Sequence, residues 1–139
     1  MNRSARPPSA MRCMPSDVPP TQKEMLAWLA IEDNAQLALS FVVGMTLEQF
    51  SGDRRTFYAV TRCLEIISEA ARRLRGVQQD QHPHLEWRQI EDAGNVFRHV
   101  YQSVAESRVW MTVHQRIPEM LAAAQTALAD TPPRTHQPK

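Results

Sequence analysis

Four polar side chains of different chemistry lie within two turns of one predicted helix: Asn95, Arg98, His99 and Tyr101. Asn95 and His99 are four residues apart and share one face of an α-helix. Gly94, Arg98 and Tyr101, spaced by four and three, follow the neighbouring stripe. An imidazole with a pKa of about 6.5 can transfer protons at neutral pH. A histidine on such a helix is more often structural, so the sequence leaves open a catalytic cluster and a structural histidine.

The predicted helix that follows Asp53 is rich in arginine. Its basic residues are Arg54, Arg55, Arg62, Arg72, Arg73 and Arg75, and its acidic neighbours are Asp53, Glu65 and Glu69. One interpretation is a basic rim for the phosphate backbone of RNA, with contacts from Arg62, Arg72 and Arg73. The other is a solvated face that is stabilised by ion pairs within the helix. The sequence leaves both open.

The remaining reactive residues do not form recognisable sites. Cys13 and Cys63 provide neither a metal site nor a disulfide framework. His82 and His84 flank a proline and have no nearby cysteine or paired carboxylate, so we expect loop residues rather than metal ligands. His114 lies beside the apolar stripe of the last helix and is expected to be structural. The sequence also lacks a phosphate-cradling glycine-rich loop, and we expect no metal and no cofactor.

Length and charge exclude several classes of protein. A chain of 139 residues has room for one domain. The net charge is +1, because the two ends of the chain together carry +3 and the body carries −2. A slightly acidic body argues against a protein that coats duplex nucleic acid, since such proteins have a strongly basic face. The longest apolar stretch, Leu37 to Met45, is much shorter than the roughly 20 residues of a membrane span. No apolar run follows the N-terminal arginines as in a secretory signal, so we expect a cytosolic protein.

Proline marks the predicted domain edges, because eight of the ten prolines lie outside residues 21–131. We therefore expect a flexible Pro-rich N-terminal segment at 1–21, a helical domain at 22–130 and a flexible C-terminal tail at 131–139. Met11, Met14 and Met25 leave open whether the N-terminal segment is a functional arm or reflects a start annotated too early.

Helices are the elements that must position these side chains. Apolar residues recur at steps of three and four, which predicts helices over 25–44, 47–51, 53–76, 87–100 and 109–128. Thr46 with Gln49 resembles a capping box, Asp53 is expected to cap the next helix, and Pro118 is expected to bend the last one. The predicted buried stripe of the first helix is Leu26, Leu29, Ala30, Leu37, Phe41 and Val42. Short connections favour an all-α, antiparallel bundle of four main helices plus one short extra helix.

Three stretches in order resemble the HepT-like ribonuclease toxins of the HEPN superfamily. They are Met45 to Phe50 leading into Asp53 and Arg54; Ala59 to Ala70; and Trp87 to Ile90 through Asn95, His99 and Tyr101, closing with Val109-Trp110 and Ile117-Pro118. The resemblance implies an HEPN-like helical bundle that forms a homodimer or a higher homo-oligomer, with active clefts at or near the dimer interface. It also implies metal-independent cleavage of RNA and an MntA-like nucleotidyltransferase antitoxin that adenylylates the motif tyrosine.

The family motif reads Arg-Asn-x-x-x-His-x-Tyr, and the chain departs from it at one position. Asn95, His99 and Tyr101 match, whereas Gly94 stands in place of the arginine. Cleavage of RNA without a metal needs a base, an acid and a cation near the phosphorus. We expect His99 to transfer protons and Arg98, one helical turn beyond Gly94, to replace the missing cation.

In a ribonuclease of this kind we expect the other residues to have the following roles. Asn95 orients the site, Glu69 is a supporting polar partner from the second helix, and Tyr101 is the target of adenylylation. The alternative is a degenerate member that keeps the fold, binds a nucleotidyltransferase or a nucleotide, and no longer cleaves RNA.

Overall fold

The computed structural model describes residues 18–98 and 101–129 of the chain. Within these residues the chain forms seven α-helices, one 3-10 helix and no strand. They are α2 (Gln22–Val42), α3 (Leu47–Ser51), α4 (Arg54–Arg72), α5 (Val77–Asp80), α6 (Trp87–Asp92), the 3-10 helix η3 (Ala93–Arg98), α7 (Gln102–Gln115) and α8 (Ile117–Ala129). The predicted all-α bundle is confirmed.

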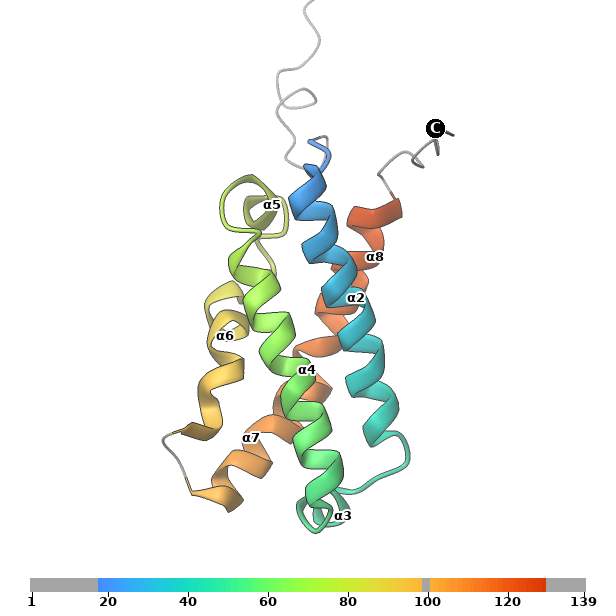
Figure 1. The fold of residues 1–139 in the computed structure, drawn as a ribbon, viewed down its shortest axis with the longest axis vertical. Coiled ribbons are helices and arrows are strands. Elements are labelled where there is room, and N and C mark those ends of the chain that lie inside the picture. The colour runs from blue at the N-terminus through green and yellow to red at the C-terminus, as the bar shows by residue number, and fades with distance from the viewer. Residues whose placement is uncertain (1–17, 99–100, 130–139) are drawn as a thin grey trace, which may run out of the picture.

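Helix α4 lies at the centre of the bundle (Figure 1). Helix α2 runs antiparallel to it on one side, and α8 packs against α2. On the other side, α6 and η3 pack against α4, and α7 contacts η3 and α8. The arginine-rich helix therefore contacts both the first helix and the segment that carries the motif residues.

The core is built mainly from large side chains of four helices. The fully buried ones include Trp28 and Ile31 of α2, Leu64 and Ile67 of α4, Val109 and Val113 of α7, and Ile117 and Met120 of α8. Complete burial of one such side chain stabilises the fold by about 1.5–3 kcal/mol before the cost of chain ordering. This core holds α4 and α7 in fixed positions beside η3.

Two predicted helix starts are confirmed. At α3, the Thr46 amide donates to Gln49 Oε1 at 3.0 Å, and the Gln49 amide donates to Thr46 Oγ1 at 3.1 Å. At α4, the carboxylate of Asp53 accepts hydrogen bonds from the amide and the hydroxyl of Thr56. The same two bonds lower the pKa of the Asp53 carboxyl. Such local signals are readable from sequence because each joins residues three apart.

The predicted buried stripe of α2 is largely wrong. Leu26, Leu29, Leu37 and Phe41 are 58%, 44%, 40% and 39% exposed. The buried face instead consists of Ala27, Trp28, Ile31, Asn34, Ala35, Ala38 and Val42. Apolar residues occur on both faces of this helix, so periodicity did not identify the inner one. Small alanines let α2 approach its neighbours closely, which leaves the leucines on the outside.

Two other predicted helices are divided. The segment expected as one helix over 87–100 is α6 followed by η3, and residues 99–100 lie outside the described part. The expected final helix is α7 and α8, separated at Arg116. Pro118 explains this break, because it lies in the first turn of α8, where its missing N–H and fixed φ are tolerated.

The second helix ends earlier than expected. Helix α4 stops at Arg72, and Gly76 lies in the following turn with a φ of +101°. This left-handed conformation favours glycine. The predicted tails fall mostly outside the described residues, while the described helices extend from Gln22 to Ala129. None of the described helices is both long enough and apolar enough to span a membrane.

Candidate active site

The 3-10 helix η3 approaches α4 closely at Gly94. The amide of Gly94 donates to Ser68 Oγ at 2.9 Å, and the Ser68 hydroxyl donates to the carbonyl oxygen of Ile90 at 2.7 Å. A Cβ atom at position 94 would lie 3.0 Å from Glu65 Cα and 3.1 Å from Ser68 Oγ. Non-bonded carbon atoms prefer separations of about 3.5–4.0 Å. This packing leaves no room for the motif arginine at position 94 unless η3 moves away from α4.

A small pocket opens beside this contact. Its volume is about 180 Å³, and it is lined by Glu65, Ser68, Glu69, Arg72, Gly94 and Asn95. Asn95 and Glu69 are both exposed. The structure thus brings together three residues to which the sequence analysis gave roles: Asn95, Glu69 and Arg72.

Two arginines lie close to the Glu69 carboxylate. Arg72 Nη1 is 3.3 Å from Glu69 Oε2, and Arg73 Nη2 is 3.6 Å from Glu69 Oε1. Exposed ion pairs of this kind contribute little to stability, about 0–1 kcal/mol. They partly neutralise the negative charge of Glu69 beside Asn95.

The guanidinium of Arg72 also bonds to the backbone. Its Nη2 donates to the carbonyl oxygen of Glu91 at 2.6 Å. The Glu91 carboxylate pairs with Arg75 and accepts a 2.7 Å hydrogen bond from Gln79 Nε2. These interactions, the Arg75 hydrogen bond above all, lower the pKa of the Glu91 carboxyl. The network ties α6 to α4 and fixes the start of η3.

The predicted RNA contacts on α4 belong to a face of mixed charge. Arg62 Nη1 lies 3.8 Å from Glu65 Oε1, and the side chains of Arg62 and Arg73 are 72% and 62% exposed. Both arginines line a second pocket of about 250 Å³, together with Glu65, Glu69 and apolar atoms of Ala30, Ile66 and Ala70. Ion pairs within the helix therefore exist on this face, as the alternative interpretation expected.

The segment that carries Asn95 is a 3-10 helix rather than the α-helix that the sequence predicts. Residues four apart align approximately on an α-helix, whereas residues three apart align on a 3-10 helix. The backbone of Arg98, the last residue of η3, therefore lies one 3-10 turn beyond that of Asn95. The rise between Asn95 and Arg98 is about 6 Å at roughly 2 Å per residue. Sequence periodicity could not reveal this, because it assumed an α-helix.

The other motif residues lie at the end of this segment. His99 is outside the described residues, and so is the side chain of Arg98. Tyr101 precedes α7 with an extended backbone, at φ −65° and ψ 152°. It is 85% exposed, so its hydroxyl is accessible to a partner.

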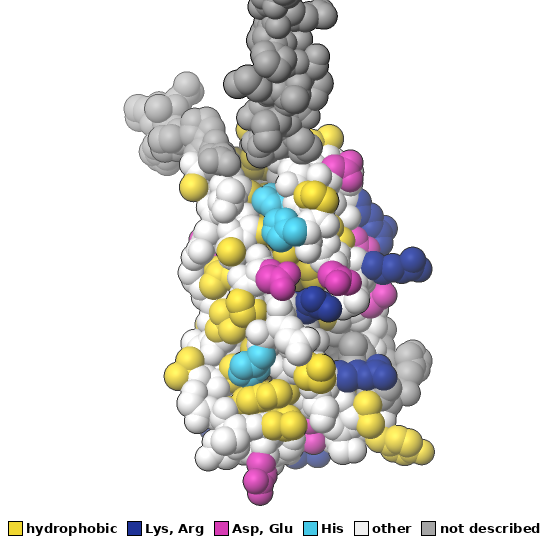
Figure 2. Space-filling model, turned by 180° about the vertical axis from the view of Figure 1, so that it is seen from behind, with side chains coloured by type: hydrophobic (Ala, Val, Ile, Leu, Met, Phe, Trp, Pro, Cys, Tyr) yellow, Lys and Arg dark blue, Asp and Glu magenta, His cyan; other side chains and the backbone are white. Residues whose placement is uncertain are grey.

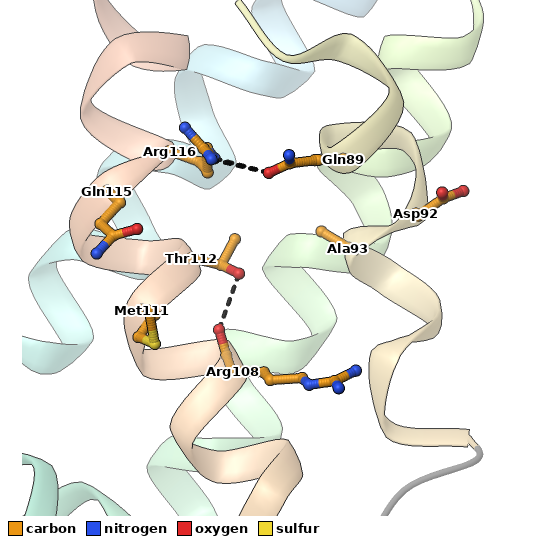
Figure 3. Close-up of a pocket in the computed structure, with 8 residues that line it drawn as sticks. All are labelled: Gln89, Asp92, Ala93, Arg108, Met111, Thr112, Gln115 and Arg116. Atoms are coloured by element: carbon orange, nitrogen blue, oxygen red, sulfur yellow. Dashed lines mark hydrogen bonds between the residues drawn. The ribbon is translucent and has the colours of Figure 1, made fainter.

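A larger pocket, which the sequence does not predict, lies between α7 and the segment formed by α6 and η3. Its volume is about 380 Å³, and it is lined by Gln89, Asp92, Ala93, Arg108, Met111, Thr112, Gln115 and Arg116 (Figure 3). The sequence places Thr112 and Gln115 on the predicted helix over 109–128, and Arg108 directly before it. It gives no signal that this segment pairs with α6 and η3.

Two of the histidines make structural contacts. The His82 ring lies edge-on to Trp28 with centroids 5.2 Å apart, and the His114 ring lies 4.1 Å from Trp110. Cys63 is buried, and burial raises the pKa of its thiol. Across residues 18–98 and 101–129, no group of three or more His, Cys, Asp or Glu side chains is arranged to hold a metal ion.

Comparisons with known proteins identify the family. The family described as "Ribonuclease HepT-like" matches residues 31–127. The "Probable ribonuclease HepT" of Thermococcus cleftensis is 31% identical over 90 residues, which cover 65% of this chain and 82% of the relative. Two Methanocaldococcus jannaschii proteins, each named "Putative RNase", are 28% identical to this chain over 92 residues. These residues cover 66% of this chain, 76% of one relative and 79% of the other. No solved structure gives a significant match. The chain therefore belongs to the HepT-like ribonuclease family.

Proposed function

We propose that this protein is a metal-independent endoribonuclease and the toxin of a toxin–antitoxin pair. Membership of the HepT-like ribonuclease family supports an RNA substrate. The observation that carries the proposal is the docking of the motif segment on α4. Gly94 holds η3 against Ser68, and Asn95 thereby lines an open pocket with Glu69 and Arg72.

The proposed reaction uses the 2′-hydroxyl of the RNA as the nucleophile. A base removes its proton, the 2′-oxygen attacks the adjacent phosphorus, and the bond from phosphorus to the 5′-oxygen breaks. An acid protonates the leaving 5′-oxygen, which gives a 2′,3′-cyclic phosphate and a 5′-hydroxyl. His99 serves as the base in its neutral form or as the acid in its charged form. Asn95 orients the phosphate, and Glu69 supports the site from α4.

We assign the cation of this reaction to Arg98. Position 94 has no room for the motif arginine, since a Cβ there would meet Glu65 Cα at 3.0 Å. Arg98 follows Asn95 by three residues, which is one turn of the 3-10 helix. Arg72 is a weaker candidate, because it already donates to the Glu91 carbonyl and pairs with Glu69.

Cleavage by purified protein tests these roles. Wild type, His99→Ala, Arg98→Ala and the control Arg88→Ala, an exposed arginine of α6, are incubated with single-stranded RNA in excess EDTA. We expect the His99 and Arg98 variants each to lose roughly 100- to 1,000-fold in rate. The control should cleave as wild type does. Arg98→Ala with normal activity would show that the cation has another source, and loss of wild-type cleavage in EDTA would contradict metal independence.

Gly94 also favours a second candidate function, since it removes the motif arginine. In this alternative the protein is a catalytically inactive HEPN-fold partner that binds a nucleotidyltransferase or a nucleotide. Induced expression without the antitoxin separates the two functions. Growth arrest with RNA loss that requires His99 supports the toxin, whereas intact RNA in cells that contain folded protein supports the inactive partner.

We further propose that an MntA-like nucleotidyltransferase antitoxin silences the protein by adenylylating Tyr101. The tyrosine oxygen would attack the α-phosphorus of ATP, and pyrophosphate would leave. The 85% exposure of Tyr101 supports this role. The attached phosphate would add negative charge three residues after Arg98, where it would repel RNA.

The exposed apolar stripe of α2 supports the proposed homodimer. Leu26, Leu29, Leu37 and Phe41 are all at least 39% exposed and lie along one long helix. A second copy of the chain would bury them. Light scattering should give a dimer for wild type and a smaller mass for Leu29→Glu. A monomeric wild type would contradict the proposal.

A further inference from the structure

The pocket between η3 and α7 combines two basic groups with apolar and amide side chains. In Figure 3 the Arg108 side chain extends from α7 toward η3 at one end of the pocket. At the other end, Arg116 donates to Gln89 Oε1 at 2.8 and 3.1 Å and joins the two walls. The pocket is thus closed by a hydrogen bond at one end and edged by a guanidinium at the other.

The two arginines of this pocket differ in their hydrogen bonds and ion pairs. Arg116 is bonded to Gln89, and its Nη2 lies 3.9 Å from Glu86 Oε1. The guanidinium of Arg108 makes no hydrogen bond or ion pair with any group that the structure describes. The one carboxylate that lines the pocket, Asp92, points away from α7 in Figure 3. Arg108 is therefore the group in this pocket that is ready to bind an anion.

The rest of the lining suits a nucleobase. Ala93 and Thr112 point into the space between the helices, and Met111, which is 52% exposed, lies on the same wall as Thr112 (Figure 3). Apolar atoms of this kind pack against the face of a base, and the amides of Gln89 and Gln115 can pair with its edges. The volume of about 380 Å³ is within the range of small-molecule sites, about 300–1,000 Å³.

The position of the pocket connects it to the motif. Ala93 lines it, and the next two residues, Gly94 and Asn95, line the smaller pocket on α4. The two pockets therefore flank η3. Figure 2, the view from behind, shows basic side chains among hydrophobic, acidic and histidine side chains on this face of the molecule. A single-stranded RNA that reaches the end of η3 can therefore place one nucleotide beside α7.

We propose that this pocket binds a nucleotide of a single-stranded RNA substrate next to the cleaved bond, with Arg108 on its phosphate. The inference rests on the proposed ribonuclease function, because it takes RNA as the ligand. Single-stranded RNA fits better than a duplex, since bases must be unstacked to enter such a pocket.

Binding to an inactive chain tests the inference. Full-length protein with His99→Ala is titrated into a short fluorescein-labelled single-stranded RNA, and anisotropy is followed at several salt concentrations. Arg108→Ala is added to this background, and Arg88→Ala serves as the matched control, because Arg88 is also exposed and does not line the pocket. Thermal melts confirm that each variant is folded.

The expected result distinguishes binding of RNA in the pocket from attraction of RNA by the net charge of the protein. Arg108→Ala should weaken binding by about tenfold and reduce the slope of log K against log salt by about 0.7, the value for one contact to a single strand. Arg88→Ala should change affinity by less than about twofold. Gln115→Ala should reduce the differences in affinity among the four homopolymeric RNAs, because it removes an amide that can read the base edge.

Two outcomes would overturn the inference. Equal losses for Arg108→Ala and Arg88→Ala would show that only net charge matters, and unchanged binding for Arg108→Ala would show that RNA does not enter the pocket. Cleavage of RNA by the protein that retains His99 is measured in parallel. This measurement tests the proposed ribonuclease function independently of the pocket. If that chain cleaves RNA while Arg108→Ala binds normally, the subsite is wrong and the ribonuclease stands. If Arg108 is needed for binding and no RNA is cleaved, the pocket binds RNA but the proposed ribonuclease function is wrong.

Discussion

Gly94 is the residue at which one added methyl group should have the largest consequence for the site. In Gly94→Ala the new Cβ would lie 3.0 Å from the backbone Cα of Glu65 and 3.1 Å from Ser68 Oγ. The first of these neighbours is backbone and cannot rotate away, so η3 must shift. Overpacking of this kind costs about 1–3 kcal/mol. We expect Gly94→Ala to lower the free energy of unfolding by that amount, and Gly94→Arg to lower it at least as much.

Urea and thermal unfolding measure this loss. For a domain of this size, 1 kcal/mol corresponds to a decrease in Tm of roughly 3–6 °C. Gly52→Ala is the matched control, because a Cβ there has no contact closer than 3.7 Å and its φ is −88°. The control should be neutral or more stable by up to about 1 kcal/mol, since alanine restricts the unfolded chain.

The cleavage assay completes this test. We expect Gly94→Arg to cleave RNA more slowly than wild type, because the arginine would displace η3 and Asn95 from α4. A Gly94→Arg protein that is as stable as wild type and cleaves faster would refute the packing argument. It would show that η3 can move away from α4 at little cost in stability, and that the wild-type chain cleaves slowly only because it lacks the motif arginine.

Three further predictions concern other parts of the molecule. The pKa of Glu91 is lowered by Arg75, so its stabilising contribution is fully present above its unfolded pKa of about 4.3 and is lost as pH falls through the lower folded value. Glu91→Gln should therefore flatten the acid limb of stability against pH, as measured by urea unfolding. Trp28 Nε1 donates to the buried Gln78 Oε1 at 2.8 Å, so Trp28→Phe should cost at least about 1–3 kcal/mol in the same assay, and no loss would contradict the bond. Tyr101→Phe should gain no mass when incubated with the antitoxin and ATP, whereas wild type should gain one adenylyl group. Modification of the phenylalanine variant would place the target elsewhere.

The elements that sequence predicted well are those fixed by local interactions. The caps at Thr46 and Asp53 involve residues three apart, and the structure confirms both. The stripe of α4 was also predicted correctly, because Phe57, Val60, Leu64 and Ile67 fall on one strongly apolar face. A helix with one apolar face has only one way to pack against a core.

The features that sequence missed depend on contacts between distant segments. Helix α2 is apolar on both faces, and which face is buried depends on its fit against α4 and α8. The close approach of η3 to α4 depends on Gly94 meeting Ser68, 26 residues earlier in the chain. The pocket beside Arg108 exists because α7 lies next to α6 and η3. None of these pairings has a local signal.

The glycine and the arginine of the motif segment are linked by the same packing. A residue with a Cβ at position 94 would hold η3 away from α4, and the Gly94 amide would lose its 2.9 Å bond to Ser68. With glycine, the segment approaches α4 and the motif arginine is lost. The backbone of residue 98 then lies one 3-10 turn beyond Asn95, and Arg98 is the residue to which we assign the cation. If this is correct, Gly94→Arg combined with Arg98→Ala should not restore cleavage, since the new arginine would displace the segment that carries Asn95. Restored cleavage in that double variant would show that the two positions are interchangeable sources of charge and that the close packing of η3 has no role in the reaction.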